Sequence, residues 1–183
     1  MILPSIAPVI LMSANEFIPL KIAVLTISDS RTIEEDTSGQ LLIDRLERAG
    51  HQCADRRLVR DDKYAIRAVV SSWIFSDEIN VVLTTGGTGV TGRDGTPEAI
   101  KPLLDKEIEG FGEMFRVLSY DDIKSSTLQS RAVSGVANAT YIFVLPGSSG
   151  ACATAWDKII EDQLDHRTMP CNLVMLMPRL KEV

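Results

Sequence analysis

A glycine-rich segment near the middle of the chain holds most of the residues whose types and spacing could carry chemistry. It follows the apolar run 79–85 and leads into a loop whose one acidic residue is Asp94. The segment itself comprises Gly86, Gly87, Thr88 and Gly89. Glycines at the end of a strand let the backbone approach a ligand closely, and they leave N–H groups free to face an anion. These residues predict a binding site for a phosphorylated small molecule, with Asp94 where the chemistry would occur.

A second acidic position lies at the end of another expected strand. Asp61 and Asp62 follow the polar run 52–59, and a solvated turn is the ordinary interpretation of such a pair. If the two strands end at the same edge of a sheet, however, Asp61 and Asp94 face the same cavity. Two carboxylates beside a phosphate site can hold Mg²⁺, which is the usual arrangement for phosphoryl or nucleotidyl transfer.

Two nucleotide-binding motifs are similar to the glycine-rich segment without fitting it. Residues 87–92 match the spacing of a dinucleotide fingerprint, but that motif opens a helix directly after the first strand, whereas residues 93–95 intervene here. A P-loop requires Lys followed by Ser or Thr where this chain has Arg93 and Asp94. A P-loop NTPase is therefore excluded, and a glycine-rich connection without a ligand is the alternative that spacing leaves open.

Alternating strands and helices are the elements that must position these residues. Strands are expected over 21–27, 52–59, 79–85 and 140–145. Helices are expected over 37–49, 63–75, 96–104, 109–118, 127–132 and 149–160, the third with Thr96 as its N-cap. Three of the strands are continuous apolar runs, which indicates a mostly parallel sheet covered on both faces, and hence an α/β fold.

The ends of the four expected strands are all polar, small or acidic. They comprise residues 28–30, 60–62, 86–89 and 146–149. Ligands of parallel α/β sheets bind at the carboxyl ends of the strands, so these segments are expected to meet at one edge. Ser148 and Ser149 also begin the closing helix, whose N-terminus can receive an anion.

Composition favours one domain over residues 21–165, with an arm at 1–20 and an irregular tail at 166–183. The chain has 183 residues, a net charge of −6 and no basic run, which argues against a nucleic-acid partner. The apolar stretch 2–12 is too short to span a membrane, and it lacks the basic start of a signal peptide. A disordered arm is the ordinary interpretation, and a natural start at Met12 is the alternative.

The small numbers of cysteines and histidines limit the compartment and the kinds of metal site that are expected. Three cysteines without a close pair indicate a reducing compartment, and we expect the protein in the cytoplasm. Only two histidines are present, so a zinc site has little support. We expect His51 to be exposed at a helix end, and Trp73 and Trp156 to lie in the core or at an interface rather than in the site.

Seven segments together resemble the MoaB/MogA family of molybdenum cofactor biosynthesis proteins, which also occurs as domains of gephyrin and the plant Cnx proteins. These segments are residues 22–29, 36–39, 84–89, 93–99, 109–116, 130–135 and 145–148. The resemblance covers nearly the whole chain after residue 12. The segments 12–19 and 164–172 are more similar to the MoaB branch than to MogA.

The resemblance implies a three-layer α/β/α fold that assembles as a homotrimer, or in some members as a homohexamer. It implies binding of molybdopterin, a pterin dithiolene with a terminal phosphate, and its adenylylation by Mg-ATP to adenylyl-molybdopterin and pyrophosphate. The family's two important aspartates, which would be catalytic and hold Mg²⁺, would fall on Asp61 and Asp94. Its phosphate and pterin contacts would fall on Ser28, Asp29, Ser30, Thr85, Gly86, Gly87, Thr88, Gly89, Ser130, Arg131, Pro146, Gly147, Ser148 and Ser149.

The residues are consistent with that chemistry. The attacking phosphate is already ionised at neutral pH, so no general base is needed, and the absence of a candidate catalytic histidine is expected. One departure is Arg60, where the family often has Pro before the first aspartate, whereas Arg93, Asp94 and Thr96 are retained. A carrier that binds molybdopterin without turnover, a redundant paralogue and a purely structural oligomer are the alternatives. The sequence does not decide whether the assembly is a trimer or a hexamer, or whether the pathway uses molybdenum or tungsten.

Overall fold

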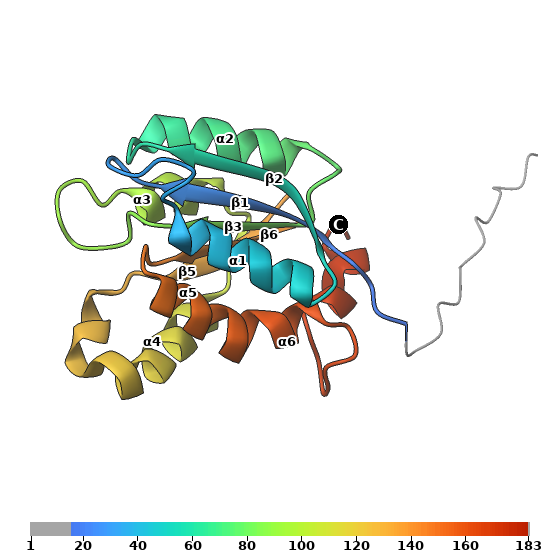
Figure 1. The fold of residues 1–183 in the computed structure, drawn as a ribbon. Helices are drawn as coiled ribbons and strands as arrows, with labels where there is room; N and C mark the ends of the chain where they lie inside the picture. Colours follow the sequence, from blue (N-terminus) through green and yellow to red (C-terminus); the bar gives the residue numbers. More distant parts are fainter. Residues whose placement is uncertain (1–15, 183) are drawn as a thin grey trace, which may run out of the picture.

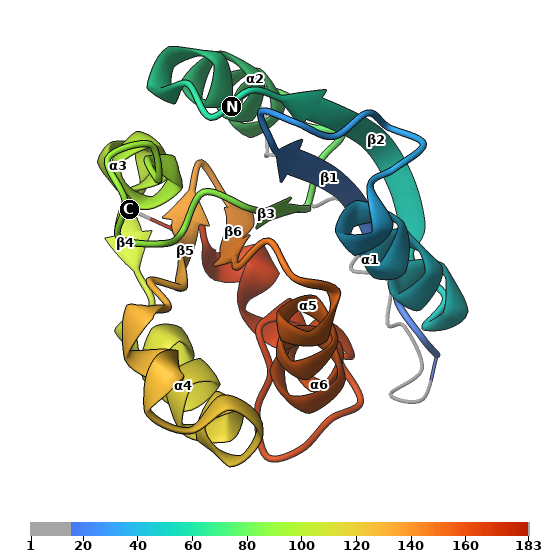
Figure 2. The ribbon, with the colours of Figure 1, turned by 60° about the vertical axis from the view of Figure 1, so that its left-hand side comes forward.

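A six-stranded sheet forms the middle layer of the protein, with helices packed on both faces (Figures 1 and 2). The computed structural model describes residues 16–182, so most of the expected N-terminal arm and the candidate start at Met12 lie outside the described residues. Within the sheet the strand order is β2-β1-β3-β6-β5-β4. Three layers with a mostly parallel sheet confirm the fold class predicted from the sequence.

The central strands are the apolar runs of the sequence. They are β1 (Lys21–Ile27), β3 (Val81–Thr85) and β6 (Thr140–Leu145), and all their residues except Lys21 are buried. They pair in parallel with one another, and β2 (Gln52–Val59) pairs in parallel with β1. Because all four point the same way, their carboxyl ends lie at one edge, as expected.

Two antiparallel strands at the other side of the sheet escaped the sequence analysis. They are β5 (Val133–Ala137), which pairs with β6, and the short edge strand β4 (Lys106–Glu107). A Cβ atom on Gly135 would lie 2.5 Å from the carbonyl oxygen of Lys106, so glycine is what lets β4 come this close. The short run around a glycine has little strand propensity of its own, and pairing with β6 decides its conformation.

Helix starts near the site are set by aspartate caps. Asp36 caps α1 (Thr37–Arg48) by accepting a bond from the Gly39 N–H at 2.9 Å. Asp62 caps α2 (Lys63–Phe75) by accepting bonds from the N–H groups of Tyr64 and Ala65. The cap explains why the sequence has two adjacent acids here: Asp62 serves the helix, which leaves the Asp61 carboxylate for other contacts.

The start of α3 (Thr96–Ile100) differs from the prediction. Gly95 occupies the N-cap position, and Thr96 is the first helical residue rather than the cap. The Thr96 hydroxyl is fully buried and donates to the carbonyl oxygen of Gly86 at 2.9 Å. It therefore joins the helix to the glycine-rich segment, a long-range contact that a local capping rule does not anticipate.

The remaining helices follow the predicted pattern with shifted ends. Helix α4 (Glu109–Ile123) is longer than expected, and a 3-10 segment, η2 (Lys124–Gln129), replaces the helix expected over 127–132. The closing helix begins as α5 (Ser149–Ala155), passes through one π-helical segment (Trp156–Ile160) and ends as α6 (Glu161–Leu164). Two further 3-10 segments are η1 (Lys101–Leu103), which follows α3, and η4 (Val174–Arg179), which lies near the C-terminus.

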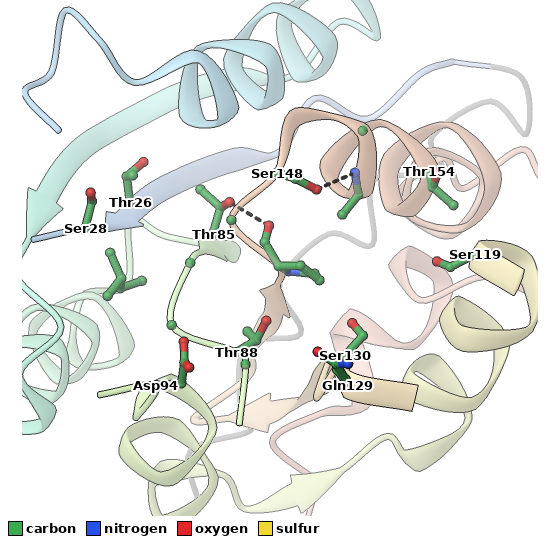
Figure 3. A pocket seen from close by; sticks show the side chains of 18 of the residues that line it. Thr26, Ser28, Thr85, Thr88, Asp94, Ser119, Gln129, Ser130, Ser148 and Thr154 are labelled. Carbon is green, nitrogen blue, oxygen red and sulfur yellow. Dashed lines mark hydrogen bonds between the residues drawn. The ribbon is translucent and has the colours of Figure 1, made fainter. Parts of the chain in front are cut away.

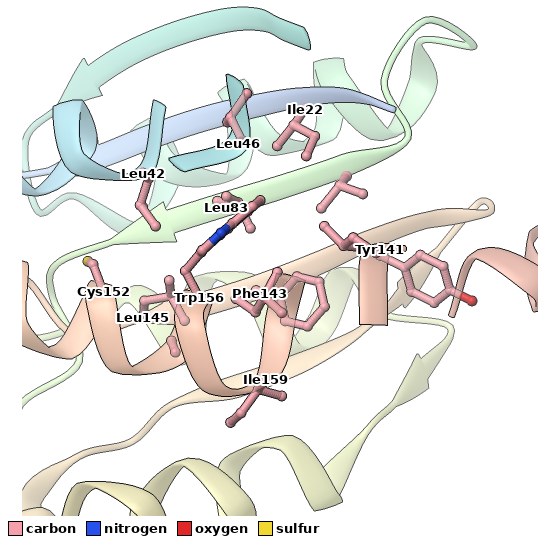
Figure 4. Packing of buried hydrophobic residues seen from close by; sticks show 14 of the residues in the cluster. Ile22, Leu42, Leu46, Leu83, Tyr141, Phe143, Leu145, Cys152, Trp156 and Ile159 are labelled. Carbon is pink, nitrogen blue, oxygen red and sulfur yellow. The ribbon is translucent and has the colours of Figure 1, made fainter. Parts of the chain in front are cut away.

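Each face of the sheet carries its own hydrophobic cluster. Helices α2 and α3 cover one face, where Trp73 is 4% exposed. Helices α1, α4, α5 and α6 cover the other, where Trp156 is 1% exposed and packs over the sheet with Leu83 and Phe143 (Figure 4). Both tryptophans are core residues, as predicted. No helix within residues 16–182 is both long and apolar enough to cross a membrane.

His51 and the C-terminal tail each pack against the domain, which local sequence patterns do not predict. His51 is 6% exposed, so the expectation of an exposed position was wrong. Its Nδ1 accepts a bond from the Leu20 N–H at 3.2 Å, and its ring lies between Phe17 and Trp156. The expected tail is docked as well, because the Tyr141 hydroxyl donates to the Leu173 carbonyl at 2.9 Å.

The turn between β5 and β6 yields a first prediction. Asn138 and Ala139 have φ angles of 45° and 66°, a conformation that costs a residue with a Cβ atom about 1 kcal/mol or more. Ala139→Gly is expected to raise the free energy of unfolding by about 1 kcal/mol. Ala68→Gly, in the exposed interior of α2, is the control and is expected to lower it by about 1 kcal/mol. Urea unfolding that shows both variants less stable than the wild type would contradict the prediction.

Burial of His51 predicts a loss of stability in mild acid. Burial lowers the pKa of His51 to about 4 in the folded protein, against about 6.5 when unfolded. The unfolded chain therefore binds the extra proton first, and stability falls as the pH drops from about 6.5 towards 4. From pH 7 to pH 5 the contribution is about 2 kcal/mol.

The variant that isolates this contribution is His51→Asn, because an amide oxygen can accept the bond from Leu20 without titrating. Urea unfolding of both proteins at pH 7 and pH 5 measures the difference. An equal loss in the wild type and the variant would assign the pH dependence to other groups.

Candidate functional site

A pocket of about 720 Å³ lies at the carboxyl ends of β1, β3 and β6 (Figure 3). Three loops that follow these strands form one side of it, with residues 28, 30–31, 86–89 and 146–148. Helices α4 and α5 and the segment η2 form the other side. Three of the four predicted strand ends therefore enclose one space large enough for a small molecule, whereas residues 60–62 lie outside its lining.

The glycine-rich loop needs its glycines because the backbone is crowded. Gly86 and Gly87 have φ angles of 109° and 64°. A Cβ atom on Gly86 would overlap the carbonyl oxygen of Ile27, and one on Gly87 would lie 2.6 Å from Oδ2 of Asp61. The Thr96 N–H donates to the Gly87 carbonyl at 3.0 Å and fixes the loop from the outside.

Asp94 is an ionised carboxylate at the wall of the pocket. Its Oδ2 accepts bonds from the backbone N–H of Thr91 at 2.9 Å and from the Thr91 hydroxyl at 2.5 Å. The bond from the Thr91 hydroxyl is the main reason that the pKa of Asp94 lies below its usual value. Asp94 is thus charged at neutral pH and available to a cation at the rim.

Asp61 lies beside the same loop without lining the pocket. Its Oδ1 accepts a bond from the Gly95 N–H at 3.3 Å, while its Oδ2 faces Gly87. Burial raises the pKa of Asp61, and repulsion from Asp94 and Asp29 raises it further. Both carboxylates lie against the glycine-rich loop, Asp61 beside Gly87 and Asp94 beside Gly89. The two aspartates suit a Mg²⁺ ion that takes its other ligands from phosphates and water.

A self-contained metal centre is not present among residues 16–182. They hold no group of three or more His, Cys, Asp or Glu side chains arranged to bind a metal ion. Asp29, the third nearby acid, is instead paired with Arg93, whose Nη2 lies 2.7 Å from its Oδ2. The donor set therefore fits a metal that arrives with a phosphate substrate, and not one held by the protein alone.

Arg131, expected to contact the ligand, is bound to the glycine-rich loop from outside the pocket. Its Nε donates to the Gly89 carbonyl at 2.7 Å and to the Thr88 carbonyl at 3.3 Å. Its Nη2 donates to the Asp94 carbonyl at 2.7 Å, and its Nη1 pairs with Glu98. These bonds span both ends of the loop 88–94, so Arg131 fixes the loop that carries Asp94.

The loop after β6 closes the pocket from another side. The Thr85 hydroxyl donates to the Pro146 carbonyl at 2.9 Å, and Ser148 caps α5 by accepting from the Ala151 N–H. The Ser149 hydroxyl pairs with that of Thr37 on α1 and does not reach the pocket. Cys152 lies behind Thr85, where burial raises its thiol pKa to about 11, so it is not a nucleophile at neutral pH.

The predicted site residues divide into those that line the pocket and those that support it. The lining set comprises Ser28, Ser30, Gly86, Gly87, Thr85, Thr88, Gly89, Asp94, Ser130, Pro146, Gly147 and Ser148. The others, Asp29, Asp61, Arg131 and Ser149, lie outside the lining. The Ser130 hydroxyl is buried without a hydrogen-bond partner among the described residues, which leaves it available to a ligand. The roles assigned to all of them stay predictions.

Several lining residues were missed. Arg31 directly follows the predicted segment 28–30, and Thr26 precedes it. Phe115, Ser119, Asp122 and Ile123 lie on one face of α4 and form the far wall with Gln129 and Thr154. Their spacing of three and four residues was a helical signal, but only packing decides that this face of α4 meets the pocket.

Comparison with known proteins places the chain among molybdopterin-related proteins. Residues 23–166 match the family described as a probable molybdopterin binding domain. Molybdenum cofactor biosynthesis protein B of Escherichia coli K12 is 57% identical over 169 residues, which cover 92% of this chain and 98% of that protein. The protein of the same name from Bacillus cereus is 49% identical over 146 residues, covering 79% and 86%.

Solved structures of similar proteins have the same fold as this chain. A crystal structure of molybdenum cofactor biosynthesis protein B superposes with a TM-score of 0.81 at 45% identity, covering 88% of this chain and 97% of that one. The tungsten cofactor synthesizing protein MoaB from Pyrococcus furiosus superposes with a TM-score of 0.75 at 34% identity, covering 90% and 98%.

The contacts of Arg131 predict that it controls the order of the loop. Lys has no planar fork and cannot reach the carbonyls of Thr88, Gly89 and Asp94 together. In Arg131→Lys, the backbone amides of residues 88–94 are expected to exchange with solvent on the order of tenfold faster. The control is Arg179→Lys, which changes an exposed pair with Glu182. Wild-type exchange rates in the Arg131 variant, measured by mass spectrometry, would remove it as the constraint on this loop.

Proposed function

The chain belongs to the MoaB/MogA family of molybdenum cofactor biosynthesis proteins, and we propose that it adenylylates molybdopterin with Mg-ATP. The products are adenylyl-molybdopterin and pyrophosphate. The observation that carries the proposal is the position of Asp61 and Asp94. Asp61 lies beside Gly87 and Asp94 beside Gly89, in a glycine-rich loop whose backbone lies against a pocket of substrate size.

The reaction requires positioning more than proton transfer. An oxygen of the molybdopterin monophosphate attacks the α-phosphorus of ATP, a new P–O–P bond forms, and the bond to pyrophosphate breaks. The attacking group is already largely ionised at neutral pH, so no protein group needs to remove a proton. The Mg²⁺ that enters with ATP neutralises charge on the phosphates. The protein's part is to hold both anions in line, which loop N–H groups and fixed carboxylates can do.

The two aspartates contribute differently. Asp94 lines the pocket and is kept ionised by its bonds from Thr91, so it is the more direct ligand for the Mg²⁺ of the nucleotide. Asp61 stands behind Gly87, where its raised pKa reflects burial and the neighbouring negative charges. A cation held by the two carboxylates would offset the negative charge that raises the pKa of Asp61, so Mg-ATP would favour the ionised form of Asp61.

A carrier that binds molybdopterin without turnover is the competing function. The observation that favours it is that Asp61 does not line the pocket in the described arrangement. Such a protein would use the same loop N–H groups and the same pocket. It would differ in leaving ATP uncleaved.

We also propose that the chain assembles as a homotrimer, or as a dimer of trimers. Large apolar side chains are exposed along α4 and η2, among them Val117 at 71% and Leu128 at 83%. Apolar side chains gathered in this way are typical of surfaces that a partner covers. Sedimentation equilibrium gives the mass of the assembly directly, and a monomer at micromolar concentration would refute the proposal.

The test of the activity is pyrophosphate release from molybdopterin and Mg-ATP, with the wild type beside Asp94→Asn. The amide keeps the size of the side chain and can still accept from Thr91, but it removes the charge. Release is expected to fall by about 10²–10³-fold. Asp162→Asn, an exposed acid on α6, is the control and is expected to behave as the wild type.

The outcomes separate the two functions. No release from the wild type, with molybdopterin binding intact, would establish the carrier and refute the transferase. Wild-type release in Asp94→Asn would remove Asp94 from the mechanism while leaving the activity in place.

A further inference from the structure

Among residues 16–182, Arg31 is the only lysine or arginine that lines the pocket, although every substrate of the proposed reaction is an anion. The pocket wall also carries two acids, Asp94 and Asp122. The other arginines nearby are engaged, since Arg93 pairs with Asp29 and Arg131 binds the loop 88–94. Because the two acids on the wall repel a phosphate, Arg31 is the side chain that can offset their charge, beside the N–H groups of the loop.

The Arg31 side chain is tethered at the edge of the pocket. Its Nη1 donates to the Ser38 hydroxyl at 3.1 Å and to the Gly147 carbonyl at 3.4 Å. Ser38 in turn donates to the Gly147 carbonyl at 2.9 Å, and the Ser28 hydroxyl accepts from the backbone N–H of Arg31. One end of the guanidinium is thus anchored by two elements, α1 and the loop after β6.

The other donors of Arg31 are available. Neither Nε nor Nη2 has a hydrogen-bond partner within residues 16–182. A guanidinium held through one nitrogen presents the remaining N–H groups in a fixed plane, which suits the oxygens of a phosphate. Although Arg31 is an exposed residue, its tether on one nitrogen prepares the remaining donors for an anion.

We propose that Arg31 binds the phosphate monoester of the pterin substrate, and not the triphosphate of the nucleotide. The assignment rests on the proposed function, because it supposes that both anions occupy this pocket. It adds a binding residue for the nucleophile and divides the pocket between the two substrates.

The division follows from where the charges lie along the glycine-rich loop. Gly147, which anchors Arg31, packs on the start of the loop, since a Cβ atom there would lie 3.2 Å from Cα of Gly86. Asp94 contacts the other end, because a Cβ atom on Gly89 would lie 2.7 Å from its Oδ2. Figure 3 shows Ser148 and Thr85 on one side of the loop and Asp94 on the other.

Opposite charges at the two ends suit different phosphates. The carboxylate end accepts a phosphate only when a divalent cation accompanies it, which is the state of the triphosphate in Mg-ATP. The Arg31 end accepts a phosphate that has no metal, which is the state of the monoester. The two reacting groups would then meet over Gly86 and Gly87, where the backbone is free of side chains.

The experiment measures molybdopterin binding without ATP, by fluorescence titration under anaerobic conditions. Arg31→Met removes the charge and keeps the stem, and Arg31→Lys keeps the charge without the fork. The control is Arg48→Met, an exposed arginine near the end of α1. Each protein is also titrated with dephosphorylated molybdopterin and with Mg-ATP. Circular dichroism confirms that each variant is folded.

We expect the Arg31 variants to lose affinity for molybdopterin only. Arg31→Met should raise the Kd for molybdopterin by about 10- to 100-fold, with a smaller rise in Arg31→Lys. The Kd values for the dephosphorylated pterin and for Mg-ATP should not change. Unchanged molybdopterin binding, an equal loss for both pterins, or a loss for Mg-ATP alone would each overturn the assignment. Because turnover is not measured here, failure of the transferase would show separately, as a wild type that binds molybdopterin and releases no pyrophosphate.

Discussion

The close passage of Gly86 against its neighbours is the constraint on which the site depends. Its N–H donates to Leu145 at the end of β6, its carbonyl accepts from Thr96 at the start of α3, and its Cα faces the carbonyl of Ile27 at the end of β1. Three strands and a helix thus meet at one residue without a side chain. Any larger residue would separate the loops, and the pocket would lose the shared backbone surface that an anion can approach.

Arg31 and Arg131 each follow a serine in the sequence, but the tertiary structure gives them different roles. Arg131 directs its guanidinium to backbone carbonyls of the loop, and so holds Asp94 in position. Arg31 lines the pocket and is tethered through one nitrogen only, which leaves its other donors without a partner among the described residues. In a chain with a net charge of −6, anion binding has to come from such local groups, because the overall field opposes it.

The far wall of the pocket connects the site to the surface of the molecule. Phe115 and Ser119 on α4 are buried and belong to the inner face of the helix, whereas Val117 and Tyr120 on its outer face are exposed. The same helix therefore shapes the pocket and presents an apolar surface. A partner that covered this surface would also fix the position of the wall, so that assembly would then influence the shape of the site.

The sequence by itself determined the features that are local. The apolar runs of β1, β3 and β6 gave a parallel sheet, and the polar strand ends gave the edge where the pocket lies, because both depend on neighbouring residues. Tertiary structure decided the rest: which of Asp61 and Asp62 caps α2, that Thr96 reaches Gly86, that Arg131 faces the loop, and that His51 is buried. The strand β5 also formed only because β6 was there to pair with it. Each of these outcomes joins residues far apart in the chain, and no local pattern encodes the direction in which a side chain finds such a partner.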